Sequence, residues 1–261
     1  MALGDFDLFD AHLHVIDPRF PLVPNNGYLP EPFTADDYLA CTQPYRLVGG
    51  AVVSGSFQAF DQSYLLDALA RLGPSFVGVT QLRADVTDAR VIELDRAGVR
   101  ALRFNLRRGG SHDVRHLDRM ARRVHEVAAW HVELYADAAH LAHLRDTLVA
   151  LPAVSIDHLG LSRAGLPALL VLAERGVRVK ATGFGRVDFD VRSALRDVWS
   201  ANPHALMFGT DLPSTRAQRP YADDDFGLVV DTLGDAAAAR VLSGNAFDFY
   251  RSQRCNLRYS L

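Results

Sequence analysis

The sequence predicts a (β/α)8 barrel, or TIM barrel, built as a single domain from residues 1–261. Short β-rich runs alternate with amphipathic helical stretches along the whole chain, which is the pattern of a parallel sheet with helices outside it. Eight such strand–helix units follow one another, and no linker composition separates them. Barrels of this kind commonly have about 250 residues, so the length fits one domain. A doubly wound open sheet is the alternative, but the first strand–helix turn lacks the glycine-rich phosphate loop of its nucleotide-binding versions.

The first predicted strand covers 6–13 and is followed by an irregular stretch rich in proline and glycine over 17–33. Thr34 and Asp37 then form a capping box, in which the hydroxyl and the acid accept hydrogen bonds from free amides at a helix start. The remaining strands are short β-rich runs, expected at 47–54, 76–82, 99–106, 132–136, 154–158, 177–182 and 205–210. Helices follow them where apolar residues recur at helical spacing, expected at 64–72, 89–97, 117–129, 141–151, 167–174, 191–200 and 225–250.

Composition excludes several classes of function. Charged residues make up 23% of the chain with both signs mixed and a net charge of -3, so we expect no binding of nucleic acid or of an anionic membrane. The only cysteines, Cys41 and Cys255, lie far apart, which argues against a disulfide framework and a cysteine-rich zinc site. The first residues lack the positive charge of a signal peptide, and no apolar run reaches the roughly 20 residues that span a bilayer. We therefore expect a cytoplasmic protein of a reducing compartment.

Ionisable side chains gather at the ends of the predicted strands, where the chemistry of a parallel barrel takes place. His12 and His14 are two residues apart on the first strand, so both imidazoles are expected to point toward the barrel axis. The other strand ends contribute Arg103, Asn105, Glu133, Tyr135, Asp157, His158, Lys180 and Asp211. Ionisable groups at five or more strand ends predict an active site whose members shift each other's pKa values. Lys180, the only lysine, fits a substrate contact and a structural ion pair equally well.

Four motifs, in order along the chain, resemble the amidohydrolase superfamily. They are DAHLH at 10–14, IDHLG at 156–160, GTD followed by Leu-Pro at 209–213, and Gly-Asn-Ala at 244–246. Three further stretches look like the branch that contains 2-pyrone-4,6-dicarboxylate lactonase and the sugar-lactone hydrolases and isomerases. They are NNGYLP at 25–30, GVRALRFNL at 98–106 and WHVEL at 130–134. The resemblance covers nearly the whole chain.

The resemblance implies hydrolysis of a small carboxylated lactone. Asp211 would be the general base that activates water, and the catalytic histidines that would polarise the lactone carbonyl are His12, His14 and His158. The residues that match substrate-binding positions are Arg103, Tyr28 and Tyr135. Arg107 and Arg108 follow in the next loop and could contact a second carboxylate. Asn105 and Lys180 are further candidates for substrate contacts.

Zinc-binding members of the superfamily use two histidines of strand one, a histidine of strand five and the aspartate of strand eight. The fifth predicted strand here offers Glu133 and Tyr135 instead of a histidine. Tyrosine is a poor zinc ligand near neutral pH because its phenol stays protonated. We therefore favour a hydrolase with no metal or other cofactor. The alternative is one divalent ion such as Zn²⁺, held by His12, His14 and Asp211.

Two departures from the related motifs leave the substrate open. Relatives carry an arginine where this chain has Leu161, and Arg163 or Arg186 could compensate for it. After strand eight, relatives read Asp-Trp-Pro-His, whereas this chain reads Asp-Leu-Pro-Ser at 211–214. The alternatives to a lactonase are a metal-dependent decarboxylase or hydrolase of the same superfamily, a sugar-acid lactone isomerase, and a non-catalytic barrel that binds a carboxylated small molecule.

Overall fold

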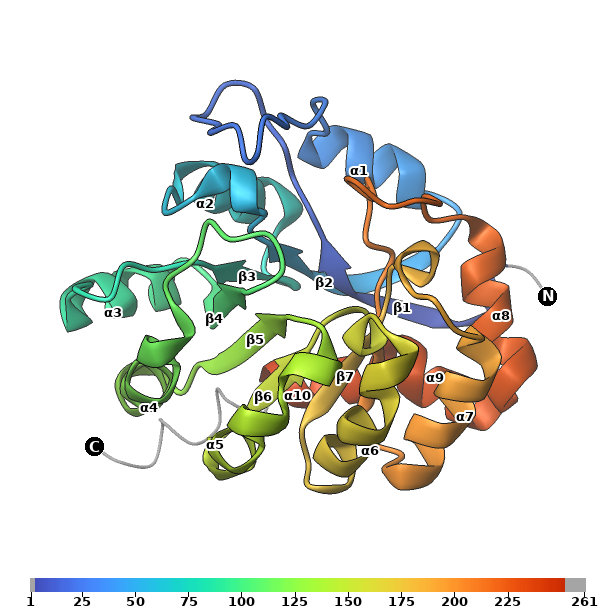
Figure 1. Cartoon of the computed structure of the whole chain (residues 1–261). Coiled ribbons are helices and arrows are strands. Elements are labelled where there is room, and N and C mark those ends of the chain that lie inside the picture. Colours follow the sequence, from blue (N-terminus) through green and yellow to red (C-terminus); the bar gives the residue numbers. More distant parts are fainter. Residues whose placement is uncertain (1–2, 252–261) are drawn as a thin grey trace.

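The computed structural model describes residues 3–251, so Cys255 lies outside the described residues. Eight parallel strands form one sheet in the order β1 to β8, with helices around it (Figure 1). They are β1 (Asp7–Leu13), β2 (Arg46–Val53), β3 (Phe76–Thr80), β4 (Val99–Asn105), β5 (His131–Tyr135), β6 (Val154–Ile156), β7 (Arg178–Ala181) and β8 (Leu206–Phe208). The end of β1 meets the turn after β8, where the amide of Asp211 donates to the carbonyl of His12 (2.7 Å). The predicted single-domain TIM barrel is confirmed.

The helices alternate with the strands as expected. They are α1 (Ala35–Thr42), α2 (Ser63–Leu72), α3 (Asp88–Arg96), α4 (Leu117–Ala128), α5 (Arg145–Ala150), α6 (Leu166–Glu174), α7 (Val191–Ala201), α8 (Asp223–Leu233), α9 (Asp235–Ala239) and α10 (Asn245–Arg251). The capping box of α1 is present, since the amide of Asp37 donates to Thr34 Oγ1 and the amide of Thr34 donates to Asp37 Oδ2. The last helices, expected over 225–250, are α8, α9 and α10: Gly234, with a φ of 77°, ends α8, and a π-helical turn follows α9.

Strands β6 and β8 have three residues each and are shorter than predicted. After β8, the amide and hydroxyl of Thr210 donate to the carboxylate of Asp10 (2.8 and 2.6 Å) instead of extending the sheet. After β6, His158 takes a left-handed φ of 52° and begins a 3-10 turn. Both strands therefore end early, and the residues that follow them turn into the mouth of the barrel.

Strand β1 contains a register shift against β2 between Asp10 and Leu13. Phe9, before the shift, and Ala11, within it, belong to the core inside the barrel, whereas Leu13, after the shift, belongs to the core between strands and helices. Such a bulge changes which side chains face a given side of the strand. It allows His12 to face the interior directly after Ala11.

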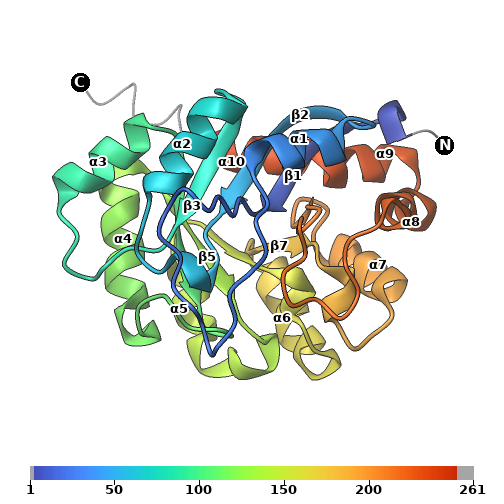
Figure 2. The ribbon, with the colours of Figure 1, turned by 90° about the horizontal axis from the view of Figure 1, so that it is seen from above.

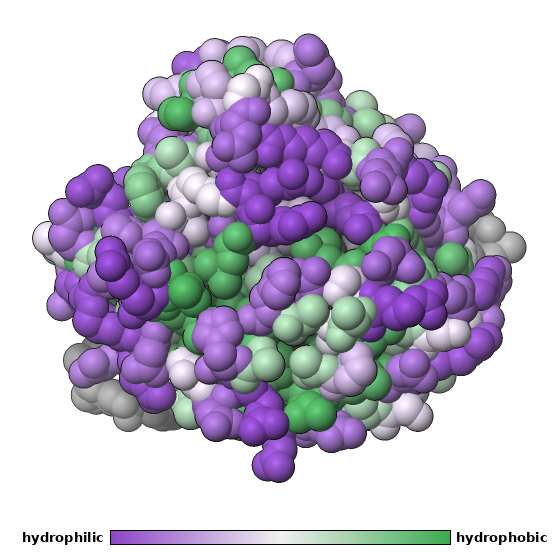
Figure 3. All heavy atoms as spheres, in the orientation of Figure 1, coloured by the Kyte–Doolittle hydropathy of each residue, from purple (hydrophilic) through white to green (hydrophobic). Residues whose placement is uncertain are grey.

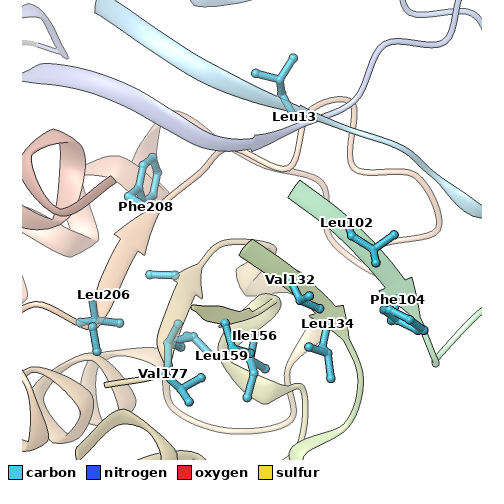
Figure 4. Close-up of a cluster of buried hydrophobic side chains, with 14 of the residues drawn as sticks. Leu13, Leu102, Phe104, Val132, Leu134, Ile156, Leu159, Val177, Leu206 and Phe208 are labelled. Carbon is cyan, nitrogen blue, oxygen red and sulfur yellow. The ribbon is translucent and has the colours of Figure 1, made fainter. Parts of the chain in front are cut away.

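Two apolar cores stabilise the barrel. The larger one lies between strands and helices, and Figure 4 shows part of it with Leu102 and Phe104 of β4 beside Val132 and Leu134 of β5. The core inside the barrel consists of Phe9, Ala11, Ala51, Val53, Val77, Val79, Ala101, Met207, Ala246, Phe249 and Tyr250. Because the ring of Tyr250 stacks on Phe9 with 5.5 Å between centroids, α10 closes the amino-terminal end. The polar interior groups are left at the carboxyl end.

Hydrophilic residues cover most of the face seen in Figure 3, with hydrophobic residues between them in its middle. The long helix α4 has 12 residues, whereas a membrane-spanning helix needs about 20. Among residues 3–251 no helix is both long and apolar enough to cross a membrane.

Candidate active site

Three buried side chains meet at the carboxyl end of the barrel: His12 of β1, His158 after β6 and Asp211 after β8. One nitrogen or oxygen atom of each lies within 4.8 Å of the others. His12 Nε2 is 3.9 Å from Asp211 Oδ1, and the rings of His12 and His158 are 4.8 Å apart. Sequence reasoning placed these three residues at one mouth of the barrel, and the structure brings them together there.

His14 lies at the edge of this group. Its Nδ1 is 2.7 Å from the carbonyl oxygen of Val53, so Nδ1 carries the proton that this carbonyl accepts. Its Nε2 then faces Asp211, at 3.7 Å from Oδ1. The ring of His14 stands nearly perpendicular to that of His12, with 5.0 Å between centroids.

The backbone at Asp211 and His158 is in the left-handed region, with φ of 62° and 52°. Non-glycine residues rarely adopt this conformation, and it persists where the surroundings fix it, often at functional sites. Here the amide of Asp211 is held by the carbonyl of His12, and the carbonyl of His158 accepts from the amide of Leu161 (2.9 Å). Both side chains are thus held toward the barrel mouth.

Arg186, in the turn after β7, binds the carboxylate of Asp211. Its Nε donates to Oδ2 at 2.7 Å, and its Nη2 donates to the carbonyl of Thr215 at 2.9 Å. Burial by itself raises the pKa of Asp211, but Arg186 and the nearby imidazoles outweigh it and hold that pKa well below its usual range. Asp211 is therefore ionised, with Oδ2 engaged by Arg186 and Oδ1 directed toward the histidines.

Two more ion pairs lie beneath the site. Arg103 Nη2 donates to Asp157 Oδ2 (2.9 Å), while Asp157 Oδ1 is 3.5 Å from His12 Nδ1. Lys180 Nζ donates to Glu133 Oε2 at 2.5 Å and lies 3.8 Å from Asp157 Oδ1. All of these side chains are buried, and each carboxylate has its own cation.

The imidazoles of His12 and His158 are neutral near pH 7. Burial lowers the pKa of His12 well below its ordinary value, and the positive charge of Lys180 lowers it further. Burial also lowers the pKa of His158, to about 4, against the opposing pull of Asp211. Each ring can therefore donate one hydrogen bond and accept another.

The lowered pKa of His158 predicts a loss of stability in mild acid. Its folded pKa is about 4 and its ordinary value 6.5, so between these values the unfolded chain binds a proton that the folded chain does not. Stability should fall as the pH drops from about 6.5 toward 4. From pH 7 to 5, we expect the wild type to lose about 2 kcal/mol more of its free energy of unfolding than His158→Gln. Urea denaturation at both pH values measures this, and identical pH dependence in the two proteins would contradict it.

A small cavity of about 30 Å³ lies above these groups. Its walls are His14, Gly55, Ser56, Phe57, Arg103, Asn105, Arg108, Tyr135, His158, Arg186, Thr215 and Arg216. A wider vestibule of about 280 Å³ shares Arg108, Tyr135, Arg186 and Arg216 with it. The predicted candidates Arg103, Asn105, Arg108, Tyr135, His14 and His158 thus line the cavity, whereas Arg216 was not identified from the sequence.

Two residues that were predicted to bind the substrate, Tyr28 and Lys180, lie away from the cavity walls. Tyr28, in the loop between β1 and α1, places its ring under the guanidinium of Arg216 at 4.2 Å, so it supports a wall residue. Lys180 forms the buried ion pair with Glu133, which was one of its two predicted roles. A direct substrate contact by either residue stays a prediction.

Arg163 does not take the place of the arginine that relatives carry at the position of Leu161. Leu161 and Arg186 both line the vestibule. The side chain of Arg163 is exposed, and its amide donates to Asp188 Oδ1. Of the two residues that could compensate, Arg186 is the one that the structure places in the cavity.

The metal candidates differ from the predicted set of His12, His14 and Asp211. The described residues bring together His12, His158 and Asp211 instead. Within residues 3–251, no hydrogen-bond partner is found for either nitrogen of His12, for His158 Nδ1 or for Asp211 Oδ1. These donors fit the usual three protein ligands of a catalytic zinc ion.

Comparison with known proteins agrees with the motifs. A family model described as amidohydrolase matches residues 9–252. The chain is 31% identical over 156 residues to a 2-pyrone-4,6-dicarboxylate hydrolase of Comamonas testosteroni, a match that covers 58% of this chain and 51% of that relative. It is 27% identical over 245 residues to a 4-sulfomuconolactone hydrolase of Rhizobium radiobacter, covering 86% and 82% of the two chains.

A solved structure shares the fold over almost its full length. It is a putative 2-pyrone-4,6-dicarboxylic acid hydrolase from Pseudomonas putida, with a TM-score of 0.77 at 25% identity, covering 96% of this chain and 98% of that one. The first relative is matched over about half its length, but the family model spans nearly all of the chain. The chain belongs to the amidohydrolase family.

Proposed function

We propose that the chain is a metal-independent hydrolase of a carboxylated lactone. One observation carries the proposal: an ionised Asp211 lies among three imidazoles under a cavity with arginines in its wall. Two relatives are named as lactone hydrolases, and both names describe anionic substrates. Asp211 is the general base in this proposal, and His12, His14 and His158 act on the carbonyl.

The proposed reaction uses the two oxygens of Asp211 differently. Oδ2 is held by Arg186, while Oδ1 has no hydrogen-bond partner within residues 3–251 and faces His12 and His14. Oδ1 takes a proton from water, whose oxygen forms a bond to the lactone carbonyl carbon. The neutral imidazoles of His12 and His158 donate to the carbonyl oxygen as it becomes negative. The ring C–O bond then breaks, the leaving oxygen receives the proton from Asp211, and an open-chain acid forms.

The contact between Arg186 and Asp211 links substrate recognition to base strength. The positive charge of Arg186 holds Asp211 ionised but also makes Asp211 a weak base. A substrate carboxylate that accepts hydrogen bonds from Arg186 shares its positive charge, so Asp211 becomes a stronger base when the substrate is in place. A lactone without a negative group cannot do this, which is why we propose a carboxylated substrate.

The charge balance favours hydrolysis without a metal. Asp157, Glu133 and Asp211 are paired with Arg103, Lys180 and Arg186, respectively. These three cations already neutralise the three carboxylates. A divalent ion would add two positive charges beside them, and like charges in a buried site repel strongly. If zinc is bound there, His12, His158 and Asp211 would hold it, and it would polarise the lactone carbonyl as a Lewis acid.

The test is a hydrolysis screen with the purified full chain. Carboxylated pyrones and sugar-acid lactones, each beside its neutral analogue, are assayed with and without a chelator, and the metal content is measured. We expect acid release from the carboxylated compounds, no stoichiometric metal, and rates that the chelator leaves unchanged. Loss of activity to the chelator that zinc restores would support the metal-dependent alternative. Conversion of one lactone to another without acid release would indicate an isomerase, and binding without turnover a binding protein.

A further inference from the structure

His12 and Asp211 lie on opposite sides of the place where the barrel closes. His12 belongs to β1, the first strand, whereas Asp211 follows β8, the last one. The described residues form a sheet in the order β1 to β8, and within them no strand ladder joins β8 back to β1. We call the contact between β1 and residues 209–212 the seam. The bonds across the seam therefore determine how far His12 lies from Asp211.

The side chain of Asp10 bridges the seam. Its Oδ1 accepts from the amide of His12 at 3.1 Å and from the amide of Thr210 at 2.8 Å. Its Oδ2 accepts from the hydroxyl of Thr210 at 2.6 Å and from the hydroxyl of Tyr38 at 3.1 Å. The carboxylate is completely buried, and it is the acceptor in all four hydrogen bonds. One side chain thus connects the backbone at His12 to the chain that follows β8.

Thr210 extends this connection to Asp211, its neighbour in the sequence. Its Oγ1 donates to Asp10 and also accepts from the amide of Leu212 at 3.1 Å, so the residues on both sides of Asp211 are tied together. The left-handed backbone of Asp211 is unfavourable by itself and needs such support. The hydroxyl of Thr210 therefore stabilises the turn that directs the carboxylate of Asp211 toward the histidines.

The two sides of the seam approach each other very closely. A methyl group added at Gly209 would lie 2.6 Å from the amide nitrogen of His12 and 3.1 Å from Asp10 Oδ1, so only glycine fits there. The amide of Asp211 then donates to the carbonyl of His12 at 2.7 Å. Figure 2 shows α1 beside β1, with the orange chain that follows β8 next to them. Close backbone contact and the bonds to Asp10 together fix the spacing across the seam.

We propose that Asp10 is a positioning residue, which holds His12 and Asp211 at the spacing that hydrolysis requires. In this role Asp10 touches neither the substrate nor the attacking water, and it acts through the backbone of His12 and Thr210. The inference rests on the proposed lactone hydrolysis, in which Asp211 takes a proton from water beside the imidazole of His12. Because a displacement of about 1 Å can lower a rate by about 10²-fold, the seam controls turnover without contributing a reacting atom.

The first test removes one hydroxyl from the seam. In Thr210→Val, which loses the bonds to Asp10 and Leu212, we expect kcat to fall about 10-fold and KM to change less than about 3-fold, because the base moves while the cavity stays intact. Thr210→Ser keeps the hydroxyl and should recover most of the lost turnover. Thr42→Val is the control, since it removes a buried hydroxyl that donates to the carbonyl of Tyr38 within α1. A kcat in Thr210→Val as high as in this control would overturn the proposal.

The second test measures the spacing itself and needs no substrate. Crystal structures of the wild type, Thr42→Val and Asp10→Ala are compared. His12 Nε2 and Asp211 Oδ1 should keep their separation of 3.9 Å in the first two proteins and shift relative to each other by about 1 Å in Asp10→Ala. If Asp10→Ala does not fold, Thr210→Val takes its place. An unchanged spacing in the folded variant refutes the positioning role, whereas a changed spacing in a protein that hydrolyses no lactone refutes only the proposed reaction.

A binding measurement separates positioning from a collapsed cavity. Benzene-1,3-dicarboxylate, a carboxylated ring that cannot be hydrolysed, is titrated by calorimetry into the full chain and into Asp10→Ala. Both proteins should bind it with similar affinity, because the walls of the cavity do not depend on Asp10. An affinity lost in parallel with kcat would show that Asp10 supports the whole site and would overturn its specific role at the seam.

Discussion

Replacing Asp211 by asparagine is expected to lower kcat by about 10²- to 10⁴-fold, the usual contribution of a general base. Asparagine cannot accept the proton of the attacking water, because an amide oxygen is a far weaker base than a carboxylate. The local structure should survive. Asparagine tolerates the left-handed backbone that Asp211 adopts, and its side-chain oxygen can still accept from Arg186. Steady-state kinetics on the best lactone of the screen gives the change in kcat.

Two measurements separate this effect from unfolding. Asp146→Asn makes the same chemical change at an exposed residue of α5 and should keep full turnover. Thermal unfolding and the binding of benzene-1,3-dicarboxylate should show that Asp211→Asn is folded and has an intact cavity. Turnover equal to the wild type in this variant would exclude Asp211 as the base and would redirect the search to His12 and His158.

The sequence predicted the fold and the centre of the site because both follow from local patterns. Alternation of β-rich and helical segments specifies a parallel barrel, and a barrel brings strand ends together whatever their exact lengths. His12, His158 and Asp211 follow or end strands, so their meeting did not depend on any side-chain detail. The boundaries of β6 and β8 were less predictable, since β8 ends where Thr210 binds Asp10 from the other end of the chain and β6 ends where His158 takes a left-handed φ.

The arginines could not be placed from the sequence in the same way. Arg186 and Arg216 lie in loops, where no periodicity indicates the direction of a side chain. Arg216 is oriented by Asn25, which is 191 residues away in the sequence, and only the folded chain brings them together. The one available signal was the change from the relatives' motif after strand eight, which indicated a different cavity shape but not a positive charge.

The buried pair of Glu133 and Lys180 shows the same limit. Alternation along β5 and β7 directs both side chains inward, but these strands are not neighbours in the sheet, because β6 lies between them. Their side chains meet across the interior, where Glu133 also accepts from Tyr250 (2.6 Å) and lies 2.9 Å from His131 Nε2. Which inward residues pair depends on the stagger of the strands around the barrel, and no local pattern specifies that stagger.

Replacing Lys180 by methionine is expected to lower the free energy of unfolding by about 3–5 kcal/mol, because it leaves the charge of Glu133 buried without its cation. Urea denaturation at pH 7 with linear extrapolation measures the change. The double variant Lys180→Met with Glu133→Gln should regain part of the loss, since it removes both charges, so the two substitutions should be strongly non-additive.

The ion pair and the substrate contact, the two roles that the sequence left open, predict opposite results. A stable Lys180→Met protein with a raised KM would assign Lys180 to the substrate, whereas a destabilised one with an unchanged KM assigns it to the buried pair.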